Sequence, residues 1–140
     1  MKYVIIYDNI YDIKVSFLGG IAMTYNVEFY QKENGDIPVM EFLLSLQPKM
    51  RAKAYREIEL LEEHGSYLRE PYVKQIKGKK NKGIYELRIR FASDISRIFY
   101  FSVKQNTFIL LSGFIKKSTN IPEKELKKAR DYKKDYERRC

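Results

Sequence analysis

Two apolar segments in the second half of the chain limit its possible folds more than any other feature. They are ISRIFYFSV, residues 95–103, and TFILLSGFI, residues 107–115, both rich in β-branched and aromatic residues. Each is too short to span a membrane, and Gln105-Asn106 between them suits a turn. Because a strand that is apolar on both sides must be covered on much of both faces, we predict two neighbouring central strands of one sheet.

The preceding segment, IYELRIRF at residues 84–91, alternates apolar and polar residues instead. This period of two predicts a strand with one face in the core and three polar side chains on the other, Glu86, Arg88 and Arg90. Ala92-Ser93-Asp94 suits a turn, so the three strands form a meander. If that turn has an even number of residues, Arg97 lies on the same face, opposite or diagonal to Arg90.

Other segments predict one further strand and three helices. YNVEFYQ, residues 25–31, predicts a strand, and VMEFLLSL, residues 39–46, predicts a short helix. Apolar residues at helical spacing predict a second helix that stops at His64-Gly65, and a third helix begins at Asn120 or Ile121. We therefore predict an α+β fold with a small antiparallel β-sheet, an N-terminal two-helix hairpin and a C-terminal helix.

Residues 1–22 form a separate N-terminal extension in this interpretation. Their two β-rich runs predict a β-hairpin, and the aspartates within them argue against a secretory signal. The codons of Gly19-Gly20, shortly before Met23, would suit a bacterial ribosome-binding sequence. Translation therefore starts at either Met1 or Met23, and we assign the main domain to residues 23–140.

The charge of the chain is uneven and points to an anionic partner. The 140 residues are 44% hydrophobic, which suits one globular domain, and carry a net charge of +9. Residues 74–140 hold 19 Lys or Arg and 7 Asp or Glu, whereas residues 1–73 hold 8 and 11. Such a basic half is typical of nucleic-acid binding, and the alternative is a basic protein without such a partner.

Several kinds of site are missing from the sequence. His64 is the one histidine, so a histidine cluster for zinc is excluded, and Cys140 is the one cysteine, so an internal disulfide is excluded. The cysteine count suits a cytoplasmic location. GKKNKG lacks the spacing of a phosphate-binding P-loop. We predict no bound metal and no cofactor.

Basic side chains are the remaining candidates for chemistry. The loop before the first meander strand carries Lys77, Lys79, Lys80 and Lys82, and Lys116 and Lys117 follow the third strand. If both hairpins are regular, we expect the third strand to end near Lys82 and Arg88, so that the basic residues converge on one face. In the alternative explanation Glu86 partly neutralises the arginines and the face is merely solvated.

A cluster of Arg, Lys and Tyr suits RNA cleavage, because RNA supplies its own nucleophile, the 2′-hydroxyl. Arginine forks match phosphate oxygens and stabilise the charge that develops on them. Lysines crowded by other cations have lowered pKa values and can transfer protons. The same residues would also bind RNA without cutting it, so the cluster by itself does not separate a nuclease from a binding protein.

Three motifs occur in an order that resembles the HigB-type, phage-associated branch of the RelE/ParE toxin superfamily. They are YELR at 85–88, SRIFYF at 96–101, and GFIKK at 113–117 followed by P-x-x-E, and the resemblance covers about residues 25–138. It implies a type II toxin that acts in the bacterial cytoplasm. The resemblance also implies inhibition by a cognate HigA-like helix-turn-helix antitoxin in a hetero-oligomer.

The activity that the resemblance implies is ribosome-dependent cleavage of mRNA, which inhibits translation. The family's basic positions match Arg88, Arg97, Lys116 and Lys117, the predicted catalytic residues. Predicted RNA contacts, matched more loosely, are Lys77, Lys79, Lys80, Lys82 and Arg90. A ParE-like inhibitor of DNA gyrase and a non-catalytic RNA-binding module are the alternatives. Ile121 departs from many relatives, which have a polar residue before the proline.

Overall fold

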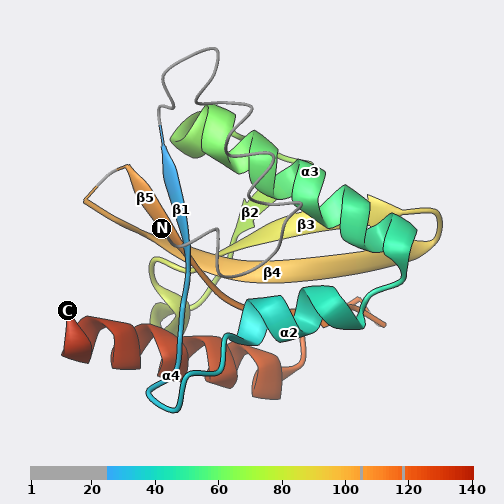
Figure 1. Ribbon diagram of the computed structural model, residues 1–140. Helices are drawn as coiled ribbons and strands as arrows, with labels where there is room; N and C mark the ends of the chain where they lie inside the picture. The colour runs from blue at the N-terminus through green and yellow to red at the C-terminus, as the bar shows by residue number, and fades with distance from the viewer. Residues whose placement is uncertain (1–24, 105, 118) are drawn as a thin grey trace.

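The computed structural model describes residues 25–104, 106–117 and 119–140, and within them the fold is α+β (Figure 1). The N-terminal extension and its predicted β-hairpin lie outside the described residues. The described residues form one sheet with the strand order β1-β5-β4-β3-β2. Its strands are β1 (Asn26–Phe29), β2 (Val73–Gln75), β3 (Tyr85–Phe91), β4 (Asp94–Val103) and β5 (Thr107–Ile115).

The predicted meander is confirmed, with β4 and β5 in the interior of the sheet. β3 and β4 are antiparallel and joined by Ala92 and Ser93, because Phe91 pairs with Asp94. Ala92 has a φ of +56°, the left-handed conformation that tight hairpin turns require. A turn of two residues keeps the faces of both strands in phase, so side chains of β3 and β4 that pair lie on the same side.

The prediction of an antiparallel sheet is wrong at one edge. β1 pairs with β5 in parallel, with Asn26 opposite Thr107 and Phe29 opposite Leu110, so the sheet is mixed. A short turn forces consecutive strands to be antiparallel, but β1 is separated from the meander by two helices. Its direction is therefore set by packing and not by a local turn.

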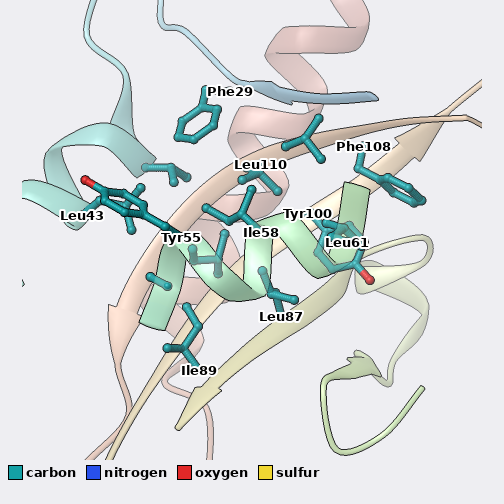
Figure 2. Packing of buried hydrophobic residues seen from close by; sticks show 14 of the residues in the cluster. Phe29, Leu43, Tyr55, Ile58, Leu61, Leu87, Ile89, Tyr100, Phe108 and Leu110 are labelled. Carbon is teal, nitrogen blue, oxygen red and sulfur yellow. The ribbon is translucent and has the colours of Figure 1, made fainter. Parts of the chain in front are cut away.

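Two helices cover one face of the sheet. They are α2 (Pro38–Ser45) and α3 (Pro48–His64), and α3 ends at Gly65, the predicted C-terminal glycine. Leu43, Ile58 and Leu61 from these helices pack against side chains of the strands, among them Leu87, Ile98 and Leu110 (Figure 2). That the two helices form an antiparallel hairpin stays a prediction.

The opposite face is covered over part of its length by α4 (Glu123–Arg139), which lies across the sheet from α3 (Figure 1). Ala129 of α4 is buried in a second cluster with Phe101 and Ile109. Tyr30, which follows β1, stabilises the position of α4, because its hydroxyl donates a hydrogen bond to Asp135 of the helix at 2.6 Å. α4 contacts β5, β4 and the short helical turn η2 (Lys79–Asn81). The part of this face that β3 forms is therefore not covered by α4.

A β-bulge in β5 changes which side chains reach the α4 face. Leu110 pairs with Tyr100 and Ser112 pairs with Phe99, so Leu111 is an extra residue between them. Because successive residues of a strand alternate between faces, one extra residue exchanges the faces for the rest of β5. As a result Phe114, and Lys116 beyond it, fall on the α4 face together with Arg97.

Gly113 allows α2 to approach the sheet closely. A Cβ atom at this position would overlap the ring of Phe42 on α2. We expect Gly113→Ala to lower the free energy of unfolding by about 1–3 kcal/mol, because the helix must shift or the ring must leave its rotamer. Urea denaturation followed by circular dichroism measures this change.

Phe42→Ala in the Gly113→Ala background provides the control. If the steric overlap is the cause, the double variant loses less stability than the sum of the two single losses. Additive losses would show that Gly113 matters for another reason.

Candidate nucleic-acid interface

The hairpin of β3 and β4 gathers the predicted arginines on one face. Arg88 pairs directly with Arg97, and Arg90 lies diagonal to Arg97, which confirms the predicted placement on one side. Glu86 is two residues before Arg88 on the same face and pairs across the sheet with Phe99. These residues lie on the α4 face, beside the part that α4 covers.

One buried carboxylate sits between the two arginines. Glu86 is 2% exposed, and its carboxylate oxygens lie 3.7 Å from Arg88 Nε and 3.5 Å from Arg97 Nε. Glu86 Oε2, Arg88 Nε, and Arg97 Nε and Nη1 are buried without a hydrogen-bond partner among the described residues. The contacts between Glu86 and the Nε atoms of the two arginines are therefore electrostatic and are not hydrogen bonds.

Glu86 neutralises the arginines only in part. One carboxylate faces Arg88 and Arg97. Lys116 lies within electrostatic reach of the same three residues and of Lys74. We call Lys74, Glu86, Arg88, Arg97 and Lys116 the cation cluster. The cluster holds one acid against four bases, which leaves a net positive charge. This partial neutralisation fits both the anion-binding interpretation and the alternative of a merely solvated face.

Arg97 occupies the bottom of the cation cluster. It is 2% exposed and pairs across the sheet with Phe114 of β5. Burial lowers the pKa of the Arg97 guanidinium, Glu86 opposes this shift, and the charges of Arg88 and Arg90 add to it. Arg88, by contrast, is partly exposed and forms the accessible surface of the cluster.

Lys116 is placed at the cluster by the bulge in β5. Its backbone N–H donates to the carbonyl of Ile95 at 2.9 Å, which extends the β4–β5 pairing by one residue. Burial lowers the pKa of the Lys116 ammonium, the charge of Arg97 lowers it further, and Glu86 opposes both effects. A lysine of this kind loses its proton more readily than an ordinary one. The next residue, Lys117, is exposed.

The loop lysines form a separate group, so the predicted proximity of Lys116 and Lys82 is wrong. β5 ends beside Ile95, near the Ala92 turn, whereas Lys82 precedes the other end of β3. A meander reverses direction twice, so the end of its third strand lies level with the end of its first. The basic residues therefore form two groups and do not converge at one point.

The loop before β3 is fixed to the C-terminal helix. Asn81 donates from Nδ2 to the carbonyl of Lys77 at 2.8 Å and accepts a hydrogen bond from Arg130 of α4 at 2.8 Å. Three loop lysines, Lys77, Lys79 and Lys82, line one open hollow, and Lys80 is exposed beside them. This lysine loop offers a second cationic surface on a fixed backbone.

Sequence reasoning missed Lys74, because residues 66–83 lacked a clear strand pattern. In the structure Lys74 lies in the short edge strand β2 opposite Glu86, which places it on the face of the cation cluster. Only pairing with β3 shows this, since three residues are too few for a recognisable period.

Two negative findings apply to the described residues. No helix there is long and apolar enough to cross a membrane. Within residues 25–104, 106–117 and 119–140, no group of three or more His, Cys, Asp or Glu side chains is arranged to hold a metal ion.

Residues 41–134, which are more than half of the chain, match the family described as phage-derived protein Gp49-like (DUF891). The chain belongs to this Gp49-like family. The family is part of the RelE/HigB-like toxin superfamily and is associated with RelE-type toxins of toxin–antitoxin systems. A search of curated proteins found no match. The coarser part of the resemblance is thus confirmed, and HigB-type specificity stays a prediction.

Removing the buried carboxylate should destabilise the protein. We expect Glu86→Gln to cost about 3 kcal/mol of unfolding free energy, because it leaves Arg97 buried without an opposite charge. The pKa of Lys116 should fall further, since Glu86 raises it. Urea denaturation measures the first effect and NMR of the lysine side chains measures the second.

Glu137→Gln is the matched control, because Glu137 pairs with Lys133 at 3.3 Å on the exposed surface of α4. Exposed pairs contribute at most about 1 kcal/mol. Equal stabilities of the two variants would contradict the role given to Glu86.

Proposed function

We propose that this protein is the toxin of a type II toxin–antitoxin system and a ribosome-dependent mRNA endoribonuclease that inhibits translation. The observation that carries the proposal is the cation cluster, in which Arg88 and Lys116 surround a buried Glu86–Arg97 pair. Membership of the Gp49-like family supports the toxin class. Crowded cations with one lowered lysine pKa can supply the proton acceptor and the charge stabilisation that cleavage by the RNA 2′-hydroxyl needs.

Arg88 would hold the phosphate that is cut. It is the partly exposed arginine of the cluster, and a guanidinium can donate two parallel hydrogen bonds to phosphate oxygens. Arg97 would act from beneath, because its 2% exposure leaves little room for direct contact with RNA. It would stabilise the developing negative charge through its field and hold Glu86 in place.

Lys116 would accept the proton of the 2′-hydroxyl. The 2′ oxygen then forms a bond to phosphorus and the bond from phosphorus to the 5′ oxygen breaks. The departing 5′ oxygen takes a proton from Lys117 or from water, which leaves a 2′,3′-cyclic phosphate and a 5′-hydroxyl end. Each step uses groups of this chain, the RNA or water.

The lysine loop and Arg90 would bind ribosomal RNA outside the cleavage site. The four loop lysines and Arg90 are exposed, which suits contacts to a phosphate backbone. A HigA-like antitoxin would bind the toxin as a hetero-oligomer. Its acidic groups would compete with RNA for the same cations.

Substitution of Arg88 tests the site. Expression of the wild type in bacteria should arrest growth and produce mapped mRNA ends, and Arg88→Ala should lower cleavage about 100-fold, as expected for the loss of one donor to the developing charge. Arg56→Ala is the matched control, because Arg56 pairs with Glu59 on an exposed face of α3. Undiminished toxicity of Arg88→Ala would contradict the assignment, and intact mRNA with inhibited DNA supercoiling would favour the gyrase alternative.

The pH dependence of cleavage tests the role of Lys116. Because neutral Lys116 accepts the proton, the cleavage rate in a purified ribosome assay should rise with pH and level off below the ordinary lysine pKa. Lys116→Arg should slow cleavage and remove this rise, since arginine stays protonated. An unchanged pH profile in Lys116→Arg would assign the proton transfer to another group.

A further inference from the structure

A pocket of about 460 Å³ opens on the other face of the sheet, the face that α2 and α3 cover. It exists because α3 stops before the sheet does. Gly65, with a φ of +51°, turns the chain out of α3 into the short helical turn η1 (Gly65–Tyr67), so the end of the sheet beside β2 stays uncovered. The pocket is separate from the cation cluster, which lies on the α4 face.

Aromatic rings form one wall of this pocket. Tyr85 and Tyr100 stack with ring centroids 5.7 Å apart and 24° between their planes. Phe108 meets Tyr100 edge to face at 5.6 Å, and both lie at one end of the core cluster (Figure 2). Such a wall offers a surface on which a flat aromatic ligand can pack.

Tyr100 also brings a hydroxyl group to the pocket. The residue as a whole is 4% exposed and lines the pocket, but its hydroxyl is not among the buried atoms that lack a hydrogen-bond partner. Burial raises the pKa of this hydroxyl and the nearby Tyr85 raises it further, so the hydroxyl stays protonated and can donate. A polar ligand in the pocket can therefore accept a hydrogen bond from it.

The rim of the pocket carries cationic and polar side chains. Arg69 is held at the rim by hydrogen bonds to the carbonyls of Ser66 and Leu68, the latter at 3.3 Å. Lys74 of the edge strand β2 also lines the pocket, but its pairing with Glu86 places its side chain on the opposite face, so Arg69 is the cationic side chain at the rim. Glu70 is the one acid among the lining residues, and exposed Gln75 and Ser102 add further donors and acceptors. The site thus combines an aromatic wall, a tyrosine hydroxyl and a guanidinium at its rim.

We propose that this pocket binds one nucleotide unit, with its base against Tyr85 and Tyr100 and its phosphate at Arg69. A base provides a flat ring and an edge acceptor for the Tyr100 hydroxyl, and a phosphate provides a negative charge for the Arg69 guanidinium. An aromatic side chain of a protein would supply neither the edge acceptor nor the charge. The pocket is also large enough for base, sugar and phosphate together.

The nucleotide has two possible sources, a free nucleotide or one unit of an RNA strand. The edge strand β2 favours neither, because it lines the pocket with Gln75 and presents the Lys74 side chain to the cation cluster on the opposite face. An RNA strand bound at the cluster would reach the pocket by crossing the short edge strand β2. The binding chemistry is the same in both cases, and it does not require that the protein cut RNA.

NMR titration of the full-length, isotope-labelled protein tests the pocket. AMP, GMP, CMP and UMP are the probes, with ribose 5-phosphate and adenosine as ligands that lack the base or the phosphate. We expect saturable shifts at Ser66, Gln75 and Ser102 with at least one nucleotide and weaker binding of both truncated ligands. No saturable shift at these residues with any of the four nucleotides would overturn the proposal.

Pocket variants sharpen the test. Tyr100→Phe removes one hydroxyl and should weaken binding about fivefold, as expected for the loss of a hydrogen bond. Ser102→Phe should fill the pocket and abolish binding, and Tyr72→Phe, at an exposed tyrosine outside the pocket, should change nothing. Affinity that is unaffected by both Tyr100→Phe and Ser102→Phe would place the ligand elsewhere and refute the proposal.

A further experiment distinguishes a free nucleotide from a unit of an RNA strand, and the pocket from the cation cluster. Short single-stranded RNA with a 2′-deoxy unit at the cleaved position is titrated into wild type, Arg88→Ala and Ser102→Phe. If Ser102→Phe weakens binding of this RNA, the pocket takes a unit of the strand. If it weakens mononucleotide binding alone, the ligand is a free nucleotide. Arg88→Ala should leave the affinity for nucleotides unchanged, because Arg88 lies outside the pocket. The binding result therefore stays valid even if the protein does not cleave mRNA.

Discussion

The burial of β4 and β5 on both faces is the constraint from which the rest of the structure follows. Strands with apolar side chains on both sides need cover above and below, which α2 and α3 supply on one face and α4 on the other. Neither cover is complete. α4 leaves the β3 side of its face open, and α3 stops at Gly65 on the other. The cation cluster and the aromatic pocket occupy these two uncovered regions.

Arg97 lies in the central strand β4, and its charge affects the pKa of a residue in the proposed site. Arg97 is buried among aromatic residues, so its charge must be balanced by Glu86. The balance is partial, and the remaining positive field lowers the pKa of Lys116. Groups whose pKa values are shifted by burial and by specific charges are frequent at functional sites. The interaction that stabilises the strand therefore also tunes the residue proposed to transfer a proton.

The edge of the sheet links the two faces. β2 has only three residues, yet Lys74 within it influences the cation cluster on one face and Gln75 lines the pocket on the other. A short edge strand exposes few unpaired backbone groups and resists pairing with other chains. In this protein it also lies between the two proposed binding regions.

The sequence by itself determined the meander, its central strands and the common face of Arg88, Arg90 and Arg97. These follow from local rules, since side chains alternate with a period of two and a short turn of even length preserves the phase. Only the tertiary structure decided the parallel direction of β1, the bulge at Leu111 that turns Lys116 to the cluster, and the position of Lys74. It also separated Lys116 from Lys82 and opened the pocket beyond α3. Each of these depends on contacts between residues far apart in the chain, which local period and propensity do not encode.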